Sequence, residues 1–370
     1  MKTVVLGGYG NFGARIARAL ADHGGIELVV AGRDLARAEA LARELGASAL
    51  RIDASAPGLG AHLAATGTGL VIHTAGPFQA QEYGVARAAA AAGCHYIDLA
   101  DGRRFVCDFK AQLDGEFQRA RRSAISGAST VPALSSAVVD EMLPRFASLQ
   151  SIDICIAPAQ QAPRGEATLA GVLSYCGAPI QVWREGRWQD GRGWSNPVPV
   201  TLARLKPRLG ALCDIPDLEL FPQRYAGVQS VMFRAALEVG ASQRVFAVLS
   251  WLRQRGLLAR PESLAGLLNR FGAVFDGWGT PAGGMVVRLR GQGMDDVPLQ
   301  LAWHITAGGH HGPEIPCMAA ILLARRLAAG EPLPSGARSC VDLLRLADFE
   351  PEFARWHMQT DLLEEPYDGS

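Results

Sequence analysis

Several features that would assign this sequence to a common protein class are missing. Its 36 basic and 36 acidic residues cancel, so it lacks the basic excess typical of nucleic-acid-binding proteins. Its 7 cysteines are odd in number and include no C-x-x-C pair, which argues against a disulfide framework or a zinc site and favours a reducing cytoplasm. No apolar run approaches the roughly 18 residues that a membrane span needs. We therefore expect a cytoplasmic chain without bound nucleic acid.

The motifs of several enzyme classes are also absent. There is no G-x-S-x-G nucleophile elbow and no phosphate-binding G-x-x-x-x-G-K-[ST] loop, so hydrolase and NTPase functions have no supporting residues. His310 and His311 are adjacent, without the spacing of metal ligands, and we expect no metal site. Met1–Leu6 runs directly into a glycine loop, so no signal peptide is expected before the fold.

What the sequence does contain is an N-terminal alternation of strands and helices. Short β-branched or apolar runs alternate with segments whose apolar residues recur at helical spacing. Such alternation predicts an α/β Rossmann fold, a doubly wound parallel sheet with helices on both faces. The expected strands are Thr3–Leu6, Glu27–Ala31, Ala49–Ile52, Leu70–Thr74, His95–Leu99 and Ser123–Ser126.

A glycine-rich loop joins the first expected strand to the first helix. In a G-x-G-x-x-G loop the first glycine permits a tight turn, the second lets backbone approach a pyrophosphate, and the third lets the helix pack close to the sheet. The N–H groups at the helix start then face the phosphates. The loop residues expected at a dinucleotide are Gly8, Tyr9, Gly10, Asn11, Phe12 and Gly13.

The end of the second strand indicates which dinucleotide binds. NAD-binding loops usually place an acidic residue there to hold the ribose 2′-hydroxyl. This chain instead has Gly32 followed by Arg33, whose guanidinium is suited to a 2′-phosphate, while Asp34 is better placed as a helix cap. We therefore predict NADP as the cofactor. Asp53, after the third strand, is either a contact at the adenine rim or a turn residue.

Three loops at the carboxyl ends of strands are expected to surround the nicotinamide, because ligands of such sheets bind at that edge. They are Ala75–Phe78, Leu99–Gly102 and Ser129–Pro132. Ser129 or Thr130 could donate to the carboxamide, although capping is the commoner role. The first and third of these loops contribute Ala75, Gly76, Pro77, Phe78 and Ser129 to the predicted cofactor site.

Candidate proton carriers lie on or after the fifth strand. Tyr96 and Asp98 alternate along it, and Asp101 follows at its mouth. A tyrosine or carboxylate near the nicotinamide could move the proton that accompanies hydride transfer. The alternative for the two aspartates is loop bracing through backbone N–H groups.

These motifs resemble those of the saccharopine dehydrogenase-like (saccharopine reductase type) family. The resemblance is carried by the opening glycine loop, Gly32–Arg33, Thr-Ala-Gly-Pro-Phe at 74–78, Gly84, Cys94, the 95–102 turn, Gly-Pro-Glu-Ile-Pro at 312–316 and Gly-Ala-Arg-Ser-Cys at 336–340. It is clear over residues 3–130 and 305–350. It implies an N-terminal NADP domain, a middle domain whose sheet covers the cofactor, and a C-terminal segment that returns to the first domain. Known members join or split an amino acid and a carbonyl compound through an imine, with hydride from NADPH.

The remainder of the chain is richer in strands than in helices. We predict a second α+β domain with a mixed or antiparallel sheet, and domain bounds of 1–128, 129–311 and 312–370. The second domain is the expected surface of any homodimer. Residues 312–330 are predicted to form an apolar helix that packs back on the Rossmann domain, with a helix internal to the second domain as the alternative.

Substrate identity is not evident in the sequence. An amino acid adduct would need arginines such as Arg164, Arg224 or Arg288, whereas a lipid-like substrate would need an apolar cleft, for which Trp183, Trp188, Trp194, Phe275 and Trp278 are available. Helix 242–255 has an apolar stripe beside arginines, which is either a core-facing stripe under a solvated face or a membrane-surface contact.

The favoured function is an NADP(H)-dependent oxidoreductase that transfers hydride to or from a C=N or C=O group of a small molecule. The alternative is a non-catalytic Rossmann module that senses cofactor or scaffolds a partner.

Overall fold

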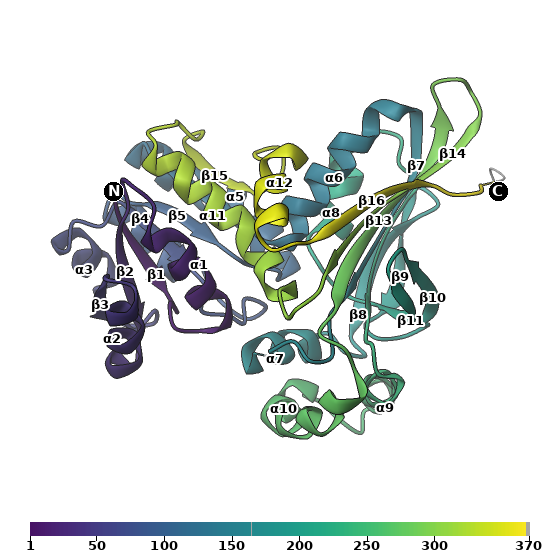
Figure 1. Cartoon of the computed structure of the whole chain (residues 1–370), viewed down its shortest axis with the longest axis horizontal. Helices are drawn as coiled ribbons and strands as arrows, with labels where there is room; N and C mark the ends of the chain where they lie inside the picture. The colour runs from purple at the N-terminus through teal and green to yellow at the C-terminus, as the bar shows by residue number, and fades with distance from the viewer. Residues whose placement is uncertain (164, 368–370) are drawn as a thin grey trace. The chain divides into compact units, whose positions relative to one another are not determined.

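The computed structural model describes residues 1–163 and 165–367, and the chain divides into two compact units (Figure 1). Unit 1 contains Met1–Leu134 and Pro313–Leu344, and unit 2 contains Ser135–Gly312 and the chain from Arg345 onward. The chain therefore leaves unit 1 after Leu134, whereas the sequence suggested a boundary at 128.

Unit 1 is built on a seven-stranded parallel sheet with strand order β15-β6-β5-β4-β1-β2-β3. Six of these strands coincide with those expected from the sequence. Five of them are short runs that the sheet buries on both faces, whereas β3 lies at the sheet edge and is partly exposed. The Rossmann-like α/β prediction is confirmed. The strands are β1 (Lys2–Leu6), β2 (Glu27–Gly32), β3 (Ser48–Arg51), β4 (Leu70–His73), β5 (His95–Asp98), β6 (Ser123–Ser126) and β15 (Gly336–Ser339).

The helices of unit 1 are amphipathic and bury one face. In α1, for example, Ile16, Ala17 and Leu20 are fully buried at three- and four-residue steps. The helices are α1 (Asn11–Ala21), α2 (Leu35–Glu44), α3 (Leu59–Ala65), α4 (Gly84–Ala91), α5 (Arg103–Ala120) and α11 (Ile315–Ala328), with an irregular turn at Thr130–Leu134 in which Val131 is extended.

Two late segments complete unit 1. Helix α11 packs against α1, and its Arg325 donates to the carbonyl of Ala19 at 3.1 Å. Strand β15 then pairs in parallel with β6 as the seventh strand. Gly336 has a φ of +99°, and a Cβ there would overlap Asp114, so glycine is required where the strand begins.

Unit 2 has a nine-stranded mixed sheet whose main path is β10-β11-β12-β7-β13-β14-β16, with the β8–β9 hairpin attached to β12. Only the β12–β7 pair is parallel among the pairs described. The predicted mixed sheet is confirmed. Its strands are β7 (Phe146–Ala157), β8 (Pro179–Arg184), β9 (Arg187–Arg192), β10 (Val198–Leu202), β11 (Leu205–Leu212), β12 (Ser230–Ala236), β13 (Gly283–Gly293), β14 (Pro298–Ala307) and β16 (Gln359–Glu364).

The helices of unit 2 are α6 (Ser135–Met142), α7 (Glu166–Ser174), α8 (Asp217–Arg224), α9 (Gly240–Gln254), α10 (Ala265–Gly272) and α12 (Leu346–Arg355). Short 3-10 turns cover Leu143–Arg145, Pro261–Leu264, Ala273–Trp278 and Gly312–Glu314. No helix among the described residues has the length and apolar character needed to cross a bilayer.

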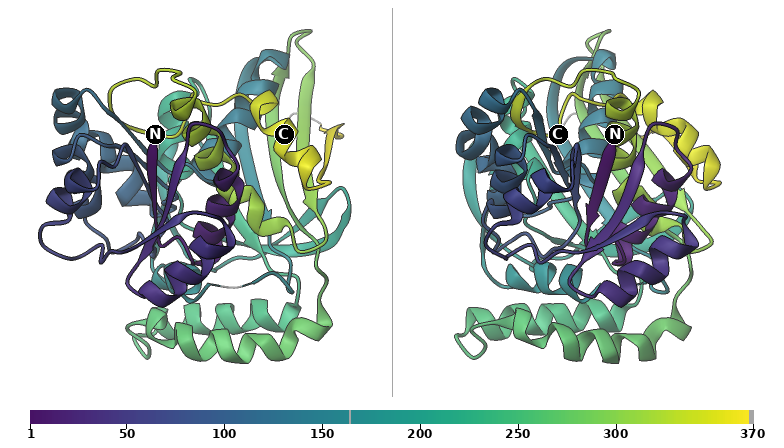
Figure 2. Two further views of the ribbon diagram at one scale, coloured as in Figure 1. Left: turned by 60° about the vertical axis from the view of Figure 1, so that its left-hand side comes forward. Right: turned by 90° about the vertical axis from the view of Figure 1, so that its left-hand side faces the viewer.

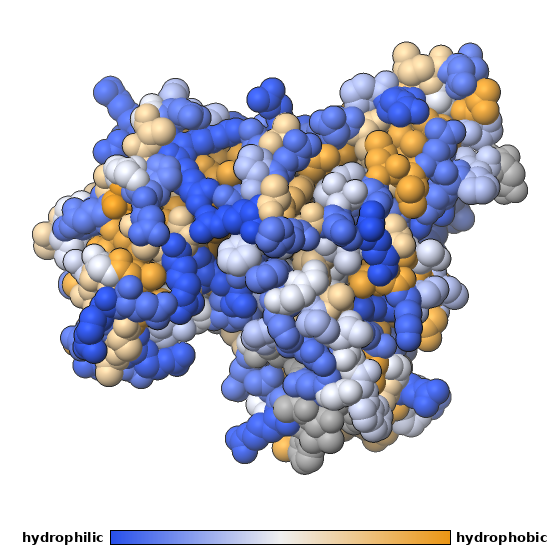
Figure 3. Space-filling view, viewed as in Figure 1, coloured by the Kyte–Doolittle hydropathy of each residue, from blue (hydrophilic) through white to orange (hydrophobic). Residues whose placement is uncertain are grey.

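The C-terminal segment is divided between the two units. The sequence had suggested that residues 312–370 return as a whole to the Rossmann domain. From Arg345 it belongs to unit 2, because β16 pairs antiparallel with β14 and Phe353 of α12 packs against Trp303 at 6.2 Å. Leu362 and Leu363 on β16 stay exposed, and Figure 3 shows apolar surface in this part of unit 2.

Candidate functional site

The glycine loop of unit 1 has the compact turn expected of a phosphate-binding loop. Gly7 adopts a left-handed φ of +81°, and the N–H groups of Gly7 and Gly8 both donate to the carbonyl of Ala31, at 2.8 and 3.0 Å. A Cβ on Gly8 would lie 2.7 Å from the carbonyl oxygen of Val5, and one on Gly13 would overlap the carbonyl of Gly7. Glycine is thus required at 8 and 13 by the protein's own backbone.

Gly10 is different: apart from its chain neighbours and the backbone of α1, the only described atom near its Cβ position is the Gly7 carbonyl oxygen at 3.1 Å. It is the N-cap of α1, with extended backbone and no side-chain cap. The start of a helix carries a partial positive charge and backbone N–H donors. An open glycine at such a position fits a bound pyrophosphate.

Tyr9 and Arg37 lie at the carboxyl end of β2. The Tyr9 ring covers Gly32 so closely that a Cβ on Gly32 would overlap it, and its hydroxyl accepts the N–H of Asp34 at 2.9 Å. The Arg37 guanidinium stacks 4.6 Å above the Tyr9 ring centre. The Asp34 carboxylate accepts the N–H of Arg37 at 3.1 Å, which confirms its predicted role as a helix cap.

Arginines gather at this end of β2 and β3. Arg33 is exposed, and the charges of Arg33 and Arg51 both help to lower the pKa of Asp53, after the larger effect of its hydrogen bonds from Ser55. Asp53 thus forms a turn with Ser55, at 3.0 Å to the N–H and 2.7 Å to the hydroxyl.

Arg37 and Arg51 were not among the sequence-predicted residues. The sequence did contain an indication for Arg37. A cation in the first turn of a helix is unfavourable next to the positive end of the helix dipole, and a bound anion nearby would offset this cost.

The loops after β4 and β5 pack against each other. Gln79 donates to Asp101 at 3.0 Å, and a Cβ on Gly102 would lie 3.1 Å from the backbone of Phe78. Gln81 donates to the carbonyls of Ala75 and Pro77, across a cis Gly76–Pro77 peptide. Burial raises the pKa of Asp101, and the Gln79 amide partly opposes the shift.

Asp98 is fully buried and braces two loops. Its Oδ1 accepts the N–H of Ala100 at 2.9 Å, the N–H of Gly127 at 2.8 Å and the Ser126 hydroxyl at 2.9 Å. Burial raises the pKa of this carboxyl to about 6, although these donors lower it. The geometry corresponds to loop bracing, the alternative interpretation of Asp98.

Tyr96 is fully buried beside His73, a residue that sequence reasoning missed. The Tyr96 hydroxyl and the Nδ1 of His73 lie 3.1 Å apart, and burial lowers the pKa of His73 to about 4, which keeps the ring neutral. The Nε2 of His73 is buried without a hydrogen-bond partner among the described residues. Phe78 packs edge-on against the His73 ring at 5.1 Å. The only sequence signal was one polar residue ending an apolar strand.

The remaining loop candidates have contacts within unit 1. Asn11 accepts a hydrogen bond from Arg15 at 2.7 Å, and the carbonyl of Phe12 faces the Cys317 thiol at 3.6 Å. Ser129 is buried, and its N–H donates to the carbonyl of Gly127 at 2.8 Å.

The arginines suggested for carboxylate binding are engaged where the structure describes them. Arg288 pairs with Glu365 through two hydrogen bonds of 2.6 and 3.1 Å, and Arg224 pairs with Asp140 at 2.8 Å. Arg164 lies outside the described residues.

The aromatic candidates are dispersed. Trp183 and Trp188 contact each other at 5.1 Å on the β8–β9 hairpin, Trp194 packs on Phe246 at 4.3 Å, and Trp278 is exposed. The side chain of Phe275 lies outside the described residues.

The histidine candidates are dispersed in the same way. His304 is buried and accepts the N–H of Ala203 at 3.2 Å, whereas His311 packs against Trp356 at 4.8 Å. His310 adopts a left-handed φ of +66° in the loop after β14. In the part of the chain that the structure describes, no group of His, Cys, Asp and Glu side chains is arranged to hold a metal.

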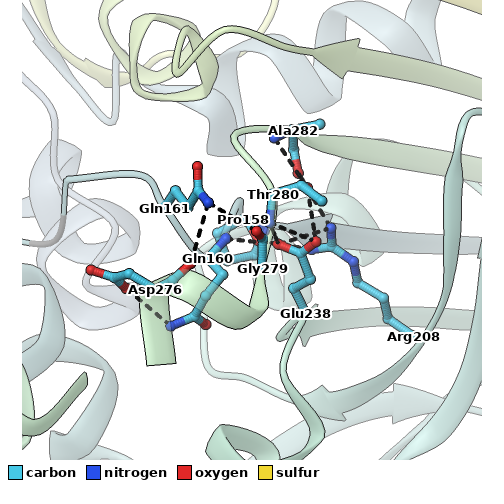
Figure 4. Close-up of polar contacts among 9 residues, drawn as sticks. All are labelled: Pro158, Gln160, Gln161, Arg208, Glu238, Asp276, Gly279, Thr280 and Ala282. Carbon is cyan, nitrogen blue, oxygen red and sulfur yellow. Dashed lines mark hydrogen bonds and ion pairs between the residues drawn. The ribbon is translucent and has the colours of Figure 1, made fainter. Parts of the chain in front are cut away.

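A partly buried polar network fixes three loops at one end of the unit 2 sheet (Figure 4). Glu238 accepts the N–H groups of Gln160 and Thr280, at 3.0 and 3.1 Å, and the Thr280 hydroxyl at 2.8 Å. The buried Arg208 donates to the carbonyls of Pro158 and Ala282 and lies 3.8 Å from Glu238. The network satisfies backbone groups where strands end, which is a structural role.

Comparison with known proteins agrees with this geometry. Residues 3–141 match the family model described as the saccharopine dehydrogenase NADP-binding domain. No curated protein sequence matches the chain.

Solved structures similar to the whole chain include apo saccharopine dehydrogenase (L-Glu forming) from Saccharomyces cerevisiae, with a TM-score of 0.69, 12% identity and coverage of 99% of this chain and 100% of that one. They also include homospermidine synthase from Legionella pneumophila in complex with NAD, with a TM-score of 0.63, 9% identity and coverage of 99% and 92%. At these identities the similarity shows a shared fold.

The resemblance suggested by the sequence motifs is thereby confirmed for residues 3–141, which match the saccharopine dehydrogenase NADP-binding domain, and the whole chain shares the fold of saccharopine dehydrogenase.

Proposed function

We propose that the chain is an NADP(H)-dependent oxidoreductase that transfers hydride to or from a C=N or C=O group of a small molecule. The observation that supports it most directly is the end of β2. There Arg33 occupies the usual acidic position, Asp34 is engaged as a helix cap, and Arg37 is held over Tyr9. This arrangement favours a 2′-phosphate over a free ribose hydroxyl.

The unit 1 residues fit such a cofactor. Gly8–Gly13 and the start of α1 would hold its pyrophosphate, and Arg33 and Arg37 would bind its 2′-phosphate. When bound, the nicotinamide supplies or accepts the hydride. Of the three predicted proton carriers, Asp101 is the one we retain, because its pKa is raised and its carboxylate is held by Gln79 at a loop rather than inside the sheet.

Calorimetry on the full chain tests the proposed preference for NADPH over NADH. The wild type is expected to bind NADPH more tightly than NADH, and Arg33→Ala should weaken NADPH about 10- to 100-fold, the effect of losing a charge-assisted contact. Arg37→Ala is expected to act in the same direction. Arg43→Ala, an exposed arginine further along α2, is the matched control and should bind as the wild type. Equal affinities of the wild type for both cofactors would refute NADP preference.

Isotope transfer tests the reaction. The enzyme is incubated with 4-deuterated NADPH and mixtures of 2-oxo acids with amines, and mass spectrometry follows deuterium into a reduced product. Asp101→Asn should lower turnover while leaving NADPH affinity within about twofold, since it removes only a proton carrier. Tight NADPH binding without transfer to any imine or carbonyl compound would favour the non-catalytic alternative.

A further inference from the structure

Helix α9 carries large apolar side chains on its outer face. Val248 and Trp251 are 54% and 50% exposed, and Val245 is also exposed. Leu249, which the sequence also places in the apolar stripe of this helix, is buried, as expected of a core-facing stripe. A core-facing apolar stripe therefore accounts for the inner side of this helix. It does not account for the large apolar residues on the outer side, where a solvated charged face would be expected.

The orientation of α9 within unit 2 is set by contacts on its inner side. Phe246 packs on Trp194, Ser250 donates to the carbonyl of Gly193 at 2.9 Å, and Arg253 donates to the carbonyls of Ser174 and Cys176 at 2.6 and 3.1 Å. Rotation of the helix to bury Trp251 would break these contacts. The apolar outer face is thus a stable feature of the fold.

Cations accompany this apolar face. Arg244 and Arg255 are exposed, and because helical neighbours lie three and four residues apart, they share a face with Val248 and Trp251. The Arg255 guanidinium lies 5.5 Å from the centre of the Trp251 ring. No acidic residue occurs between Glu238 and Glu262.

The same segment exposes three more large apolar residues. They are Leu257 after α9, Leu267 on α10 and Trp278, which is 71% exposed. Figure 2 shows α9 and α10 as a helical layer at the lower edge of unit 2. Single exposed apolar residues are common, but Val245, Val248 and Trp251 follow one another at three-residue steps along one face of α9, and such a continuous apolar strip marks an interaction surface.

We propose that the outer face of α9, with the α10 segment beside it in sequence, docks on an anionic lipid bilayer surface. Tryptophan and arginine suit the level of the lipid headgroups, where the ring meets the acyl boundary and the guanidinium meets phosphate. A second copy of the chain is a poorer occupant, because a twofold contact through this face would oppose arginines of like charge. A nucleic acid offers no apolar surface for the valines.

Flotation of the full chain with lipid vesicles tests this proposal. Wild-type protein is expected to float with vesicles of phosphatidylcholine and phosphatidylglycerol, more weakly with phosphatidylcholine alone, and less as salt rises from about 0.05 to 0.5 M. The V248D/W251D variant should lose at least about 10-fold in binding to both vesicle types. The R244Q/R255Q variant should lose roughly fivefold per arginine, and only on anionic vesicles.

Matched control variants distinguish a loss of binding at this surface from a general effect of the substitutions on folding or charge. Trp188→Ala and Arg187→Gln change an exposed tryptophan and arginine on the β8–β9 hairpin and should bind vesicles as the wild type. All variants should keep wild-type NADPH affinity and circular dichroism. The proposal is overturned if the wild type does not float, if V248D/W251D floats equally well, or if ultracentrifugation shows that this variant converts a dimer into a monomer.

Discussion

Gly10 and Gly13 belong to one sequence motif but are glycine for different reasons. A Cβ on Gly13 would overlap the Gly7 carbonyl and lie 2.7 Å from the Thr74 hydroxyl, so the fold itself requires glycine there. At Gly10 the Gly7 carbonyl oxygen is the only described atom close to a Cβ, apart from the chain neighbours and the backbone of α1. The proposed pyrophosphate would supply the requirement for glycine at Gly10, and this makes Gly10 the cleaner position for a binding test.

We predict that Gly10→Val abolishes NADPH binding while unit 1 still folds. The added side chain would occupy the space that a pyrophosphate needs at the start of α1. Energy transfer from protein tryptophan to bound NADPH reports binding, and circular dichroism reports folding. Gly24→Val is the control, since a Cβ at Gly24 meets no atom within 4 Å, and it should bind normally. A folded Gly10→Val protein with wild-type NADPH affinity would contradict the prediction.

Helix α11 shows how an element distant in sequence becomes part of the Rossmann unit. Its apolar residues recur at helical spacing, Pro316 lies in its first turn, and Cys317, Met318 and Leu323 are buried. The apolar stripe predicted from sequence is largely correct, but Leu322 and Leu327 are only half-buried.

We predict that Leu323→Ala destabilises unit 1 by about 2–5 kcal/mol, the usual result of truncating a fully buried leucine. Leu322→Ala, one residue earlier and half-buried, should cost less than half as much. Urea unfolding followed by circular dichroism measures both. Equal losses for the two variants would mean that α11 does not pack as described.

At the scale of the whole molecule, the chain passes between the two units three times, after Leu134, Gly312 and Leu344. The first passage leads directly to Ser135, whose hydroxyl donates to Asp217 in a fully buried pair. Burial raises the pKa of Asp217 to about 7, although the Ser135 hydrogen bond opposes the shift, and its Oδ2 has no partner among the described residues.

This buried carboxyl predicts a specific pH dependence. A folded pKa raised above the ordinary aspartate value of 3.8 means that the folded state binds the extra proton, so stability is lost as pH rises from about 4 to about 7. Asp217→Asn cannot ionise and escapes this loss. The free energy of unfolding of the variant minus that of the wild type should rise by up to about 4 kcal/mol between pH 4 and pH 8.

Paired urea titrations at the two pH values measure this change. His73 and His95, whose pKa values are lowered by burial, contribute the opposite pH trend, but they are present in both proteins and cancel in the comparison. A difference between variant and wild type that stays constant with pH would contradict a raised pKa for Asp217.

The sequence by itself determined the elements whose signal is local. The short apolar strands β1 to β6, the glycine loop, the Asp34 cap and the amphipathic α11 each follow from residues close together in the chain. The sequence also established the family resemblance over residues 3–141, because the motifs in that range lie beside those strands.

The tertiary structure decided what depends on partners distant in sequence. Strand β16 is almost entirely exposed and shows no alternation, so only its pairing with β14 makes it a strand. The position of the Arg37 side chain depends on its stacking against the Tyr9 ring, and that of the His73 ring depends on its contact with the Tyr96 hydroxyl. The outward face of α9 is likewise set by contacts with residues 174–194, since helical periodicity shows that two faces differ but not which one the rest of the fold will cover.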